Sequence, residues 1–158
     1  MVISDCFLNG TVCEIRSRDK YEAIRELIKK APVFNKIEDI NAFEEEIIYR
    51  EKRQCTGFGK GVAVAHGCTG TDSVYIALGI SREGINYNAY DKQPVQLLFV
   101  IVSPPDMPDE YLMVLSVLVK LVRDERFREE LLSCFSIEEA EQKLREAFFS
   151  LLKREKIK

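Results

Sequence analysis

The feature that most constrains the fold is the run Leu97–Val102, in which every residue is apolar. A strand with apolar side chains on both faces belongs inside a sheet that is covered on both sides. The run is also far shorter than the roughly 20 residues that a membrane-spanning helix requires. It therefore predicts an inner strand of a covered sheet, which we place at Val95–Val102.

Helical patterns lie before and after a central block of strands. Capping boxes at Asp19/Glu22 and Ser136/Glu139 each precede apolar residues at helical spacing. We expect helices at about 19–30, 40–47, 108–122, 124–131 and 136–151, and strands at about 11–15, 62–65, 73–80, 84–87 and 95–102. This order favours an α/β fold over residues 1–158: a single domain with a mixed β-sheet covered by helices on both faces, in a three-layer sandwich. The basic segment 153–158 is expected to fray.

Composition excludes several classes of protein. The chain has 23 Lys and Arg against 26 Asp and Glu, a net charge of −3, which argues against a general nucleic-acid binder. An apolar fraction of 46% is too high for a disordered chain. No secretory leader opens the sequence, so we expect a cytoplasmic protein without direct membrane insertion.

Cysteine and histidine counts limit the possible chemistry. The five cysteines contain no C-x-x-C pair, which disfavours both a disulfide framework and a zinc ribbon. Because His66 is the single histidine, a site with two histidines is excluded. We therefore expect neither a metal nor an organic cofactor.

The segment from Arg50 to Asp72 carries the candidate chemistry. Three glycines, Gly57, Gly59 and Gly61, allow close approach of the backbone and lead into a short buried strand. His66 follows at the expected end of this strand, where ligands bind in open α/β sheets. A histidine placed there can accept or pass on a phosphoryl group, with Arg50 as the cation that offsets the phosphate charge.

Three other interpretations of this segment remain open. His66 can be a structural histidine with satisfied hydrogen bonds. The glycine loop can cradle a nucleotide, although a dinucleotide fingerprint follows a strand and opens a helix, whereas here the predicted order is helix, loop, strand. Cys68 can pair with His66 as nucleophile and base, as in a small hydrolase.

A family resemblance bears on this choice. The matching blocks are Arg50-Glu51, Thr56-Gly57-Phe58-Gly59-Lys60-Gly61-Val62-Ala63-Val64-Ala65-His66-Gly67, Gly84-Ile85, Asp91-Lys92-Gln93-Pro94-Val95, Leu97-Leu98-Phe99, Leu112-x-x-Leu115 and the element from Asp124 to Leu131. Together they resemble the enzyme IIA domains of the fructose/mannitol class of the bacterial phosphoenolpyruvate:sugar phosphotransferase system. This class includes the nitrogen-regulatory enzyme IIA proteins. The resemblance covers nearly the whole chain.

The resemblance implies a phosphocarrier that serves sugar transport or nitrogen regulation. His66 would accept the phosphoryl group and Arg50 would neutralise it. Gly67, Cys68 and Thr69 would form the phosphate-binding loop, and the residues that shape the preceding loop would be Thr56, Gly57, Gly59 and Gly61. The donor would be an HPr-type phosphocarrier protein, and the acceptor an enzyme IIB domain or a regulated target protein. A regulatory interaction module of the same fold, with slow or no phosphotransfer, is the alternative.

The sequence departs from the family pattern at three positions. Ala65 stands where the family usually has proline, and Lys92 stands where it usually has glycine. Tyr111 stands where a second histidine normally begins the helix beside the active histidine. Tyr111 is expected either to replace that histidine as a hydrogen-bond donor or to serve only in packing.

Overall fold

One mixed β-sheet organises the molecule. The computed structural model describes residues 5–8 and 10–157. The sheet contains β1 (Val12–Glu14), β2 (Gly57–Gly59), β3 (Val62–Cys68), β4 (Tyr75–Ile85) and β5 (Val95–Ser103), in the order β1-β4-β5-β3-β2. The pairs β1·β4 and β3·β5 are parallel, whereas β4·β5 and β2·β3 are antiparallel. The mixed sheet expected from the sequence is confirmed.

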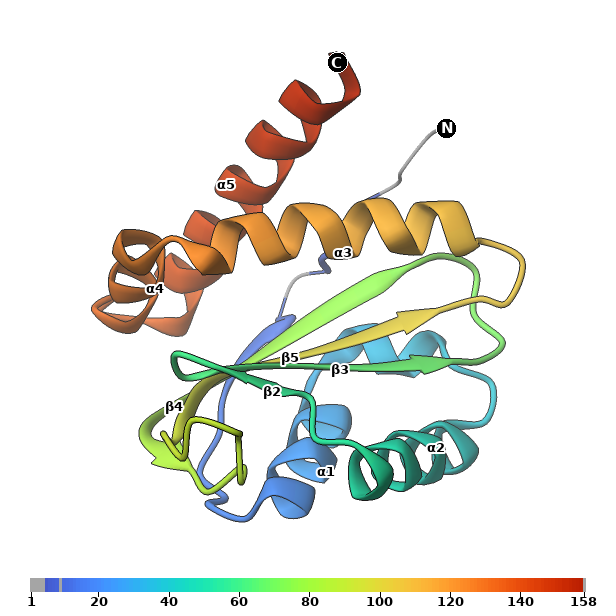
Figure 1. Cartoon of the computed structure of the whole chain (residues 1–158). Coiled ribbons are helices and arrows are strands. Elements are labelled where there is room, and N and C mark those ends of the chain that lie inside the picture. Colours follow the sequence, from blue (N-terminus) through green and yellow to red (C-terminus); the bar gives the residue numbers. More distant parts are fainter. Residues whose placement is uncertain (1–4, 9, 158) are drawn as a thin grey trace.

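Helices cover both faces of this sheet (Figure 1). One face carries α1 (Lys20–Lys30), the 3₁₀ helix η1 (Pro32–Lys36) and α2 (Ile40–Arg53). The other face carries α3 (Pro108–Arg123), α4 (Glu125–Leu132) and α5 (Ile137–Ile157). The three-layer α/β sandwich is therefore confirmed.

Strand β5 lies in the interior, as its apolar run predicts. Leu97, Phe99 and Ile101 belong to the core under α3, α4 and α5. The alternate residues Leu98 and Val100 belong to the core between the sheet and helices α1 and α2. Alternating side chains of one strand thus join the two cores.

Several element bounds differ from the expected ones. The segments expected at 73–80 and 84–87 form one long strand, β4, whose pairing register shifts between Ile80 and Ile85. Helix α5 continues through residues 153–157 where fraying was expected, and an ion pair of 2.9 Å between Lys120 and Glu155 ties this end of α5 to α3. Residue 158 lies outside the described residues.

The β2–β3 hairpin leaves part of the sheet edge open. Positive φ angles at Gly59 (95°), Lys60 (60°) and Gly61 (79°) form the tight turn between the two strands. Strand β2 pairs with β3 only at Val62 and Ala63, and the Val64 amide donates to the carbonyl of Thr56 at 3.2 Å. Beyond Val64, β3 is an edge strand lying between α2 and α3. The candidate site lies at this edge.

Candidate functional site

His66 lies on β3, two residues before the strand ends. Because β-strand side chains alternate, His66 shares the α3 face with Val64, whereas Ala65 and Gly67 face α2. A Cβ atom on Gly67 would lie 2.5 Å from a ring carbon of Phe43. Glycine at this position therefore lets α2 pack closely behind the histidine.

Two side chains hold the His66 ring. Its Nε2 lies 2.8 Å from the hydroxyl oxygen of Ser103, the last residue of the neighbouring strand β5. The ring of Tyr111 on α3 stacks on the imidazole, with centroids 3.9 Å apart and planes at 16°. The imidazole is half-buried. Burial, and next the positive charge of Arg50, lower the pKa of His66 from 6.5 to about 4. The ring is therefore neutral near pH 7.

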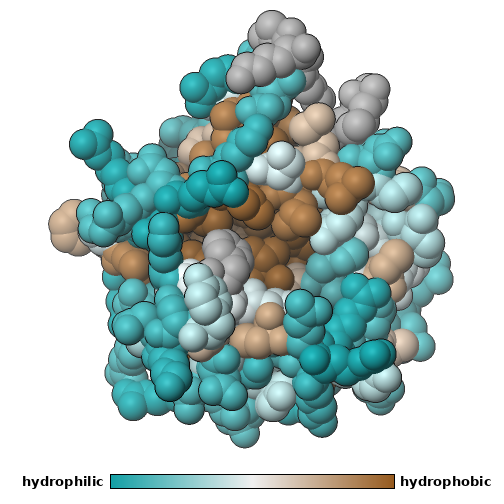
Figure 2. Space-filling model, viewed as in Figure 1, coloured by the Kyte–Doolittle hydropathy of each residue, from teal (hydrophilic) through white to brown (hydrophobic). Residues whose placement is uncertain are grey.

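Arg50 reaches the same place from the other layer. It lies in the last turn of α2, is exposed, and forms an ion pair of 2.9 Å with Glu46 one turn earlier. Arg50, His66 and Tyr111 line one open cavity of about 870 Å³. The sequence expectation that Arg50 and His66 come together is consistent with this geometry. Figure 2 shows that apolar side chains also gather in a hollow at the centre of the face seen in Figure 1, with hydrophilic side chains around them.

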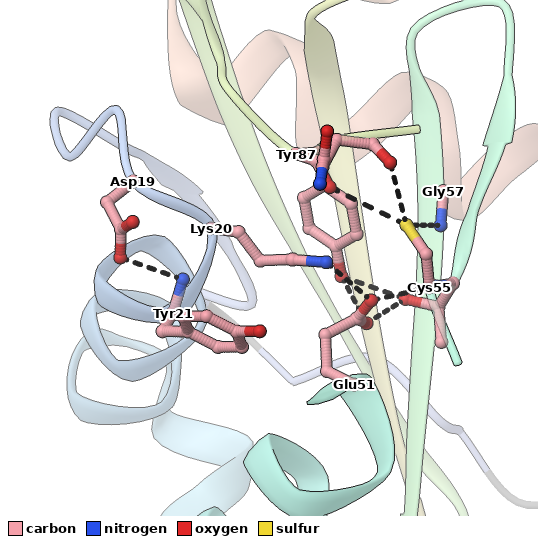
Figure 3. A network of polar contacts seen from close by, with 9 residues as sticks. Asp19, Lys20, Tyr21, Glu51, Cys55, Gly57 and Tyr87 are labelled. Carbon is pink, nitrogen blue, oxygen red and sulfur yellow. Dashed lines mark hydrogen bonds and ion pairs between the residues drawn. The ribbon is translucent and has the colours of Figure 1, made fainter. Parts of the chain in front are cut away.

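A buried polar network fixes the end of α2 beside Arg50 (Figure 3). The carboxylate of Glu51 is fully buried and forms an ion pair with Lys20 at 3.2 Å. It also accepts hydrogen bonds from the Thr56 amide at 2.9 Å, from the Thr56 hydroxyl, and from the Tyr87 hydroxyl at 2.8 Å. These contacts join α1, α2 and the start of β2. Sequence reasoning missed this role of Glu51, because nothing in a charge pattern distinguishes one buried glutamate from its exposed neighbours.

Two of the four predicted loop-shaping residues, Thr56 and Gly57, lie in or beside this network (Figure 3). Thr56 donates to Glu51, and Gly57 packs so closely that a Cβ atom would lie 2.9 Å from the Cβ of Ala89. Gly59 and Gly61 form the hairpin turn at the far end of β2 from the cavity. The segment that the sequence predicted as a glycine loop therefore contains the short strand β2.

The predicted phosphate-binding loop needs correction. Gly67 and Cys68 belong to β3, because β3 pairs with β5 as far as Cys68 and Ser103. The Thr69 amide donates to the Ser103 carbonyl at 3.0 Å, so it is occupied. The described residues that line the cavity include none of these three. The Thr69 amide is thus used by the sheet, and Gly67 and Cys68 stand in a strand and not in a loop.

Ser103 is the other residue that sequence reasoning missed. It is 3% exposed and follows the apolar run of β5. A serine at the end of a strand is common, and only the parallel pairing of β3 with β5 brings its hydroxyl to His66.

Metal binding and membrane crossing find no support in the described part of the chain. No group of three or more His, Cys, Asp or Glu side chains there is placed to hold a metal ion. None of its helices has both the length and the hydropathy needed to cross a bilayer.

The site thus consists of a neutral imidazole, with a guanidinium in the wall of the same cavity, at the open edge of a mixed sheet. Residues 8–147 match the model of the family described as "Phosphoenolpyruvate-dependent sugar phosphotransferase system, EIIA 2". The chain belongs to this family, which supports a phosphocarrier or regulatory role of the IIA type.

Relatives of the chain include proteins of sugar transport. It is 32% identical over 138 residues to the fructose-specific EIIABC component of Bacillus subtilis, covering 86% of this chain but only 22% of that protein. It is 33% identical over 120 residues to the fructose-specific EIIA component of Haloferax volcanii, covering 74% of this chain and 77% of that one.

Solved structures include a regulatory relative. The nitrogen regulatory protein IIA-Ntr of Neisseria meningitidis superposes with a TM-score of 0.78 at 27% identity, over 89% of this chain and 97% of that one. The IIA mannitol domain of Escherichia coli, solved in complex with phosphorylated enzyme IIB, has a TM-score of 0.69 at 19% identity, over 91% of this chain and 97% of that one. The second likeness shows a shared fold.

Proposed function

We propose that this chain accepts a phosphoryl group on His66 from a phosphohistidine of a donor protein, and then passes it on or signals with it. The lone pair of a neutral His66 ring nitrogen attacks phosphorus. The new P–N bond forms as the P–N bond to the donor histidine breaks, and that electron pair returns to the donor nitrogen. Such transfer depends on positioning and on stabilising the charge of the phosphoryl oxygens.

The observation that carries this proposal is the neutral imidazole in an open cavity that Arg50 also lines. A protonated imidazole has no lone pair with which to attack. With a pKa of about 4, His66 keeps its lone pair at neutral pH. A structural histidine needs neither an open cavity nor a cation in its wall.

Arg50 would bind the phosphoryl oxygens during transfer. Its guanidinium forms a solvent-exposed ion pair with Glu46, an interaction worth at most about 1 kcal/mol. A doubly charged phosphoryl group, held by two parallel N–H donors, competes well with such a partner. We expect Arg50→Ala to slow acceptance by about 100-fold, as loss of one stabilising donor does elsewhere.

The proposed partners are an HPr-type phosphocarrier as donor and an enzyme IIB domain or a regulated target protein as acceptor. The E. coli IIA mannitol domain was solved with its phosphorylated enzyme IIB, and the two chains share a fold. Exposed apolar side chains lie around the site, with Tyr49 in the cavity wall and Leu112 beside Tyr111. A docked partner would cover them. We also propose that the chain acts in the cytoplasm, as a single enzyme IIA-like domain.

Intact-mass measurement tests the proposal. The chain is incubated with phosphoenolpyruvate, enzyme I and an HPr-type donor. We expect an acid-labile gain of one phosphoryl group, which is absent when enzyme I is omitted. The same gain must be absent from His66→Ala, whose melting curve shows that it is folded. No gain in the wild type, or an equal gain in His66→Ala, would overturn the proposal.

Regulation without transfer is the second candidate, and Tyr111 favours it. The family usually places a second histidine where this chain has a tyrosine, and a nitrogen regulatory protein is among the structural relatives. In that case a bound target protein would be retained equally by the wild type and by His66→Ala. Binding that depends on phosphorylation of His66 would exclude this candidate.

A further inference from the structure

Three elements converge on the imidazole of His66. Strand β3 carries the histidine, strand β5 supplies Ser103, and helix α3 supplies Tyr111. Arg50 from α2 is the charged group that lowers the histidine pKa, and Glu46 is its ion-pair partner. The ring is therefore in contact at one nitrogen and on one face, while the cavity remains open beside it.

The position of Ser103 is set by the sheet and not by its own side chain. It pairs with Cys68 in the parallel ladder, and its carbonyl accepts from the Thr69 amide at 3.0 Å. Because this backbone is paired on the β3 side, the buried Ser103 hydroxyl has a fixed position next to Nε2 of His66. A hydroxyl can donate to a ring nitrogen or accept from it, so this contact restricts the orientation of the ring in either tautomer.

Tyr111 is placed by the first turn of α3. Its amide donates to the Met107 carbonyl at 3.2 Å, and its ring packs at the edge of the core formed under α3. The near-parallel planes, 16° apart, put the tyrosine ring over the imidazole face. The lone pairs of an imidazole lie in the ring plane, so a group stacked above that plane leaves the line of attack open. The tyrosine hydroxyl lies in the stacked plane and not at the end of a lone pair.

We infer that Ser103 and Tyr111 are positioning residues that together hold the His66 imidazole in one orientation, and that Tyr111 acts through its aromatic face and not through its hydroxyl. This inference rests on the proposed function, because the reaction it serves is phosphoryl acceptance. Positioning by Ser103 and Tyr111 explains how His66 can react without the second histidine that the family usually has. Stacking replaces a side chain that could itself hydrogen-bond or change charge.

The physical benefit is a lower entropic cost of reaching the reactive geometry. An attacking atom must lie within about 3–3.5 Å of phosphorus with its lone pair aligned, and displacement by about 1 Å can cost 100-fold in rate. A histidine held only by its own backbone turns about two side-chain bonds. A hydrogen bond in the ring plane and a stacked ring above it together restrict both rotations.

The test uses variants of the full chain and two measurements. The ¹⁵N resonances of the ring and the pKa of His66 are measured by NMR on unphosphorylated protein, and the phosphorylation rate is measured with the HPr-type donor. Tyr111→Phe keeps the ring and loses the hydroxyl, whereas Tyr111→Ala loses both. The matched controls are Tyr90→Ala, an exposed tyrosine away from the cavity, and Ser116→Ala, an exposed serine on α3.

We expect Tyr111→Ala and Ser103→Ala each to slow phosphorylation at least about tenfold. Tyr111→Ala should raise the pKa of His66 towards 6.5, because it removes the cover that buries the ring. Ser103→Ala should shift the ¹⁵N resonance of Nε2, because this nitrogen loses its hydrogen-bond partner. Tyr111→Phe should recover most of the rate and the wild-type pKa, and both controls should match the wild type.

Two results would overturn the inference. One is a Tyr111→Phe variant as slow as Tyr111→Ala, which would assign the role to the hydroxyl. The other is a Ser103→Ala variant whose ring ¹⁵N resonances and phosphorylation rate equal those of the wild type. The NMR readouts need no phosphoryl transfer. If the wild type fails to accept a phosphoryl group while the NMR effects appear, the proposed function is wrong, but Ser103 and Tyr111 still position the imidazole.

Discussion

Replacing Glu51 by glutamine tests whether its buried carboxylate keeps the end of α2 in place. The side chain of Glu51 is 0% exposed and that of its partner Lys20 is 10% exposed, so water screens this ion pair little. Removing one partner of a buried pair leaves an uncompensated charge and costs about 3–5 kcal/mol. A glutamine can keep its oxygen towards Lys20 and the Thr56 amide, but its NH2 group then faces the Thr56 and Tyr87 hydroxyls, which donate to Glu51 in the native chain.

We therefore expect Glu51→Gln to lower the free energy of unfolding by about 3 kcal/mol. In a domain of this size that corresponds to a fall in melting temperature of roughly 6–12 °C. Denaturant and thermal unfolding followed by circular dichroism measure both quantities. Adding Lys20→Met to Glu51→Gln removes the stranded charge and should recover part of the loss.

Glu46→Gln is the matched control, because Glu46 lies on the same helix and its ion pair with Arg50 is exposed to solvent. Exposed ion pairs contribute at most about 1 kcal/mol, so this variant should melt within about 2–4 °C of the wild type. If Glu51→Gln is no less stable than Glu46→Gln, the buried network does not hold the site together and the reasoning is wrong.

Two further predictions concern the histidine and the glycine behind it. Because the pKa of His66 in the folded state, about 4, lies below the ordinary value of 6.5, the unfolded chain takes up the proton first on acidification. The free energy of unfolding should fall as the pH drops from about 6.5 to about 4. The expected fall is on the order of 1–2 kcal/mol, because solvent screens the half-exposed ring. Urea unfolding at several pH values should show this pH dependence, and His66→Gln should lack it. Gly67→Ala should cost about 1–3 kcal/mol, because its Cβ would lie 2.5 Å from the Phe43 ring. Gly70→Ala, whose Cβ would have ordinary contacts, is the control, and equal melting temperatures for the two variants would contradict the close packing of α2 on β3.

Local patterns predicted the elements well where one physical signal dominated. The apolar run of β5 predicted a strand covered on both faces, and the presence of β5 side chains in both cores confirms this prediction. The capping box at Asp19 was also informative, since its carboxylate accepts from the Tyr21 and Glu22 amides at the start of α1. In both cases the residues that carry the signal are adjacent in the chain.

Predictions failed where long-range pairing overrode the local pattern. Glycines at 57, 59 and 61 indicated a loop, yet β3 recruits residues 57–59 as a partner strand. Strand β3 also runs past His66, because pairing with β5 continues to Cys68. That extension turned an expected phosphate-binding loop into sheet and occupied the Thr69 amide.

The amino-acid sequence alone determined which groups are available for chemistry: one histidine, an arginine sixteen positions before it, and a tyrosine where the family usually has a second histidine. It also determined the α/β class, because hydrophobic periodicity is a property of neighbouring residues. Only the tertiary structure decided what surrounds the imidazole. Ser103 and Tyr111 lie far from His66 along the chain, and they reach it because parallel pairing of β3 with β5 and the packing of α3 set their positions in space. Burial and the nearby guanidinium, which together keep the ring neutral, follow from that packing and from no local pattern.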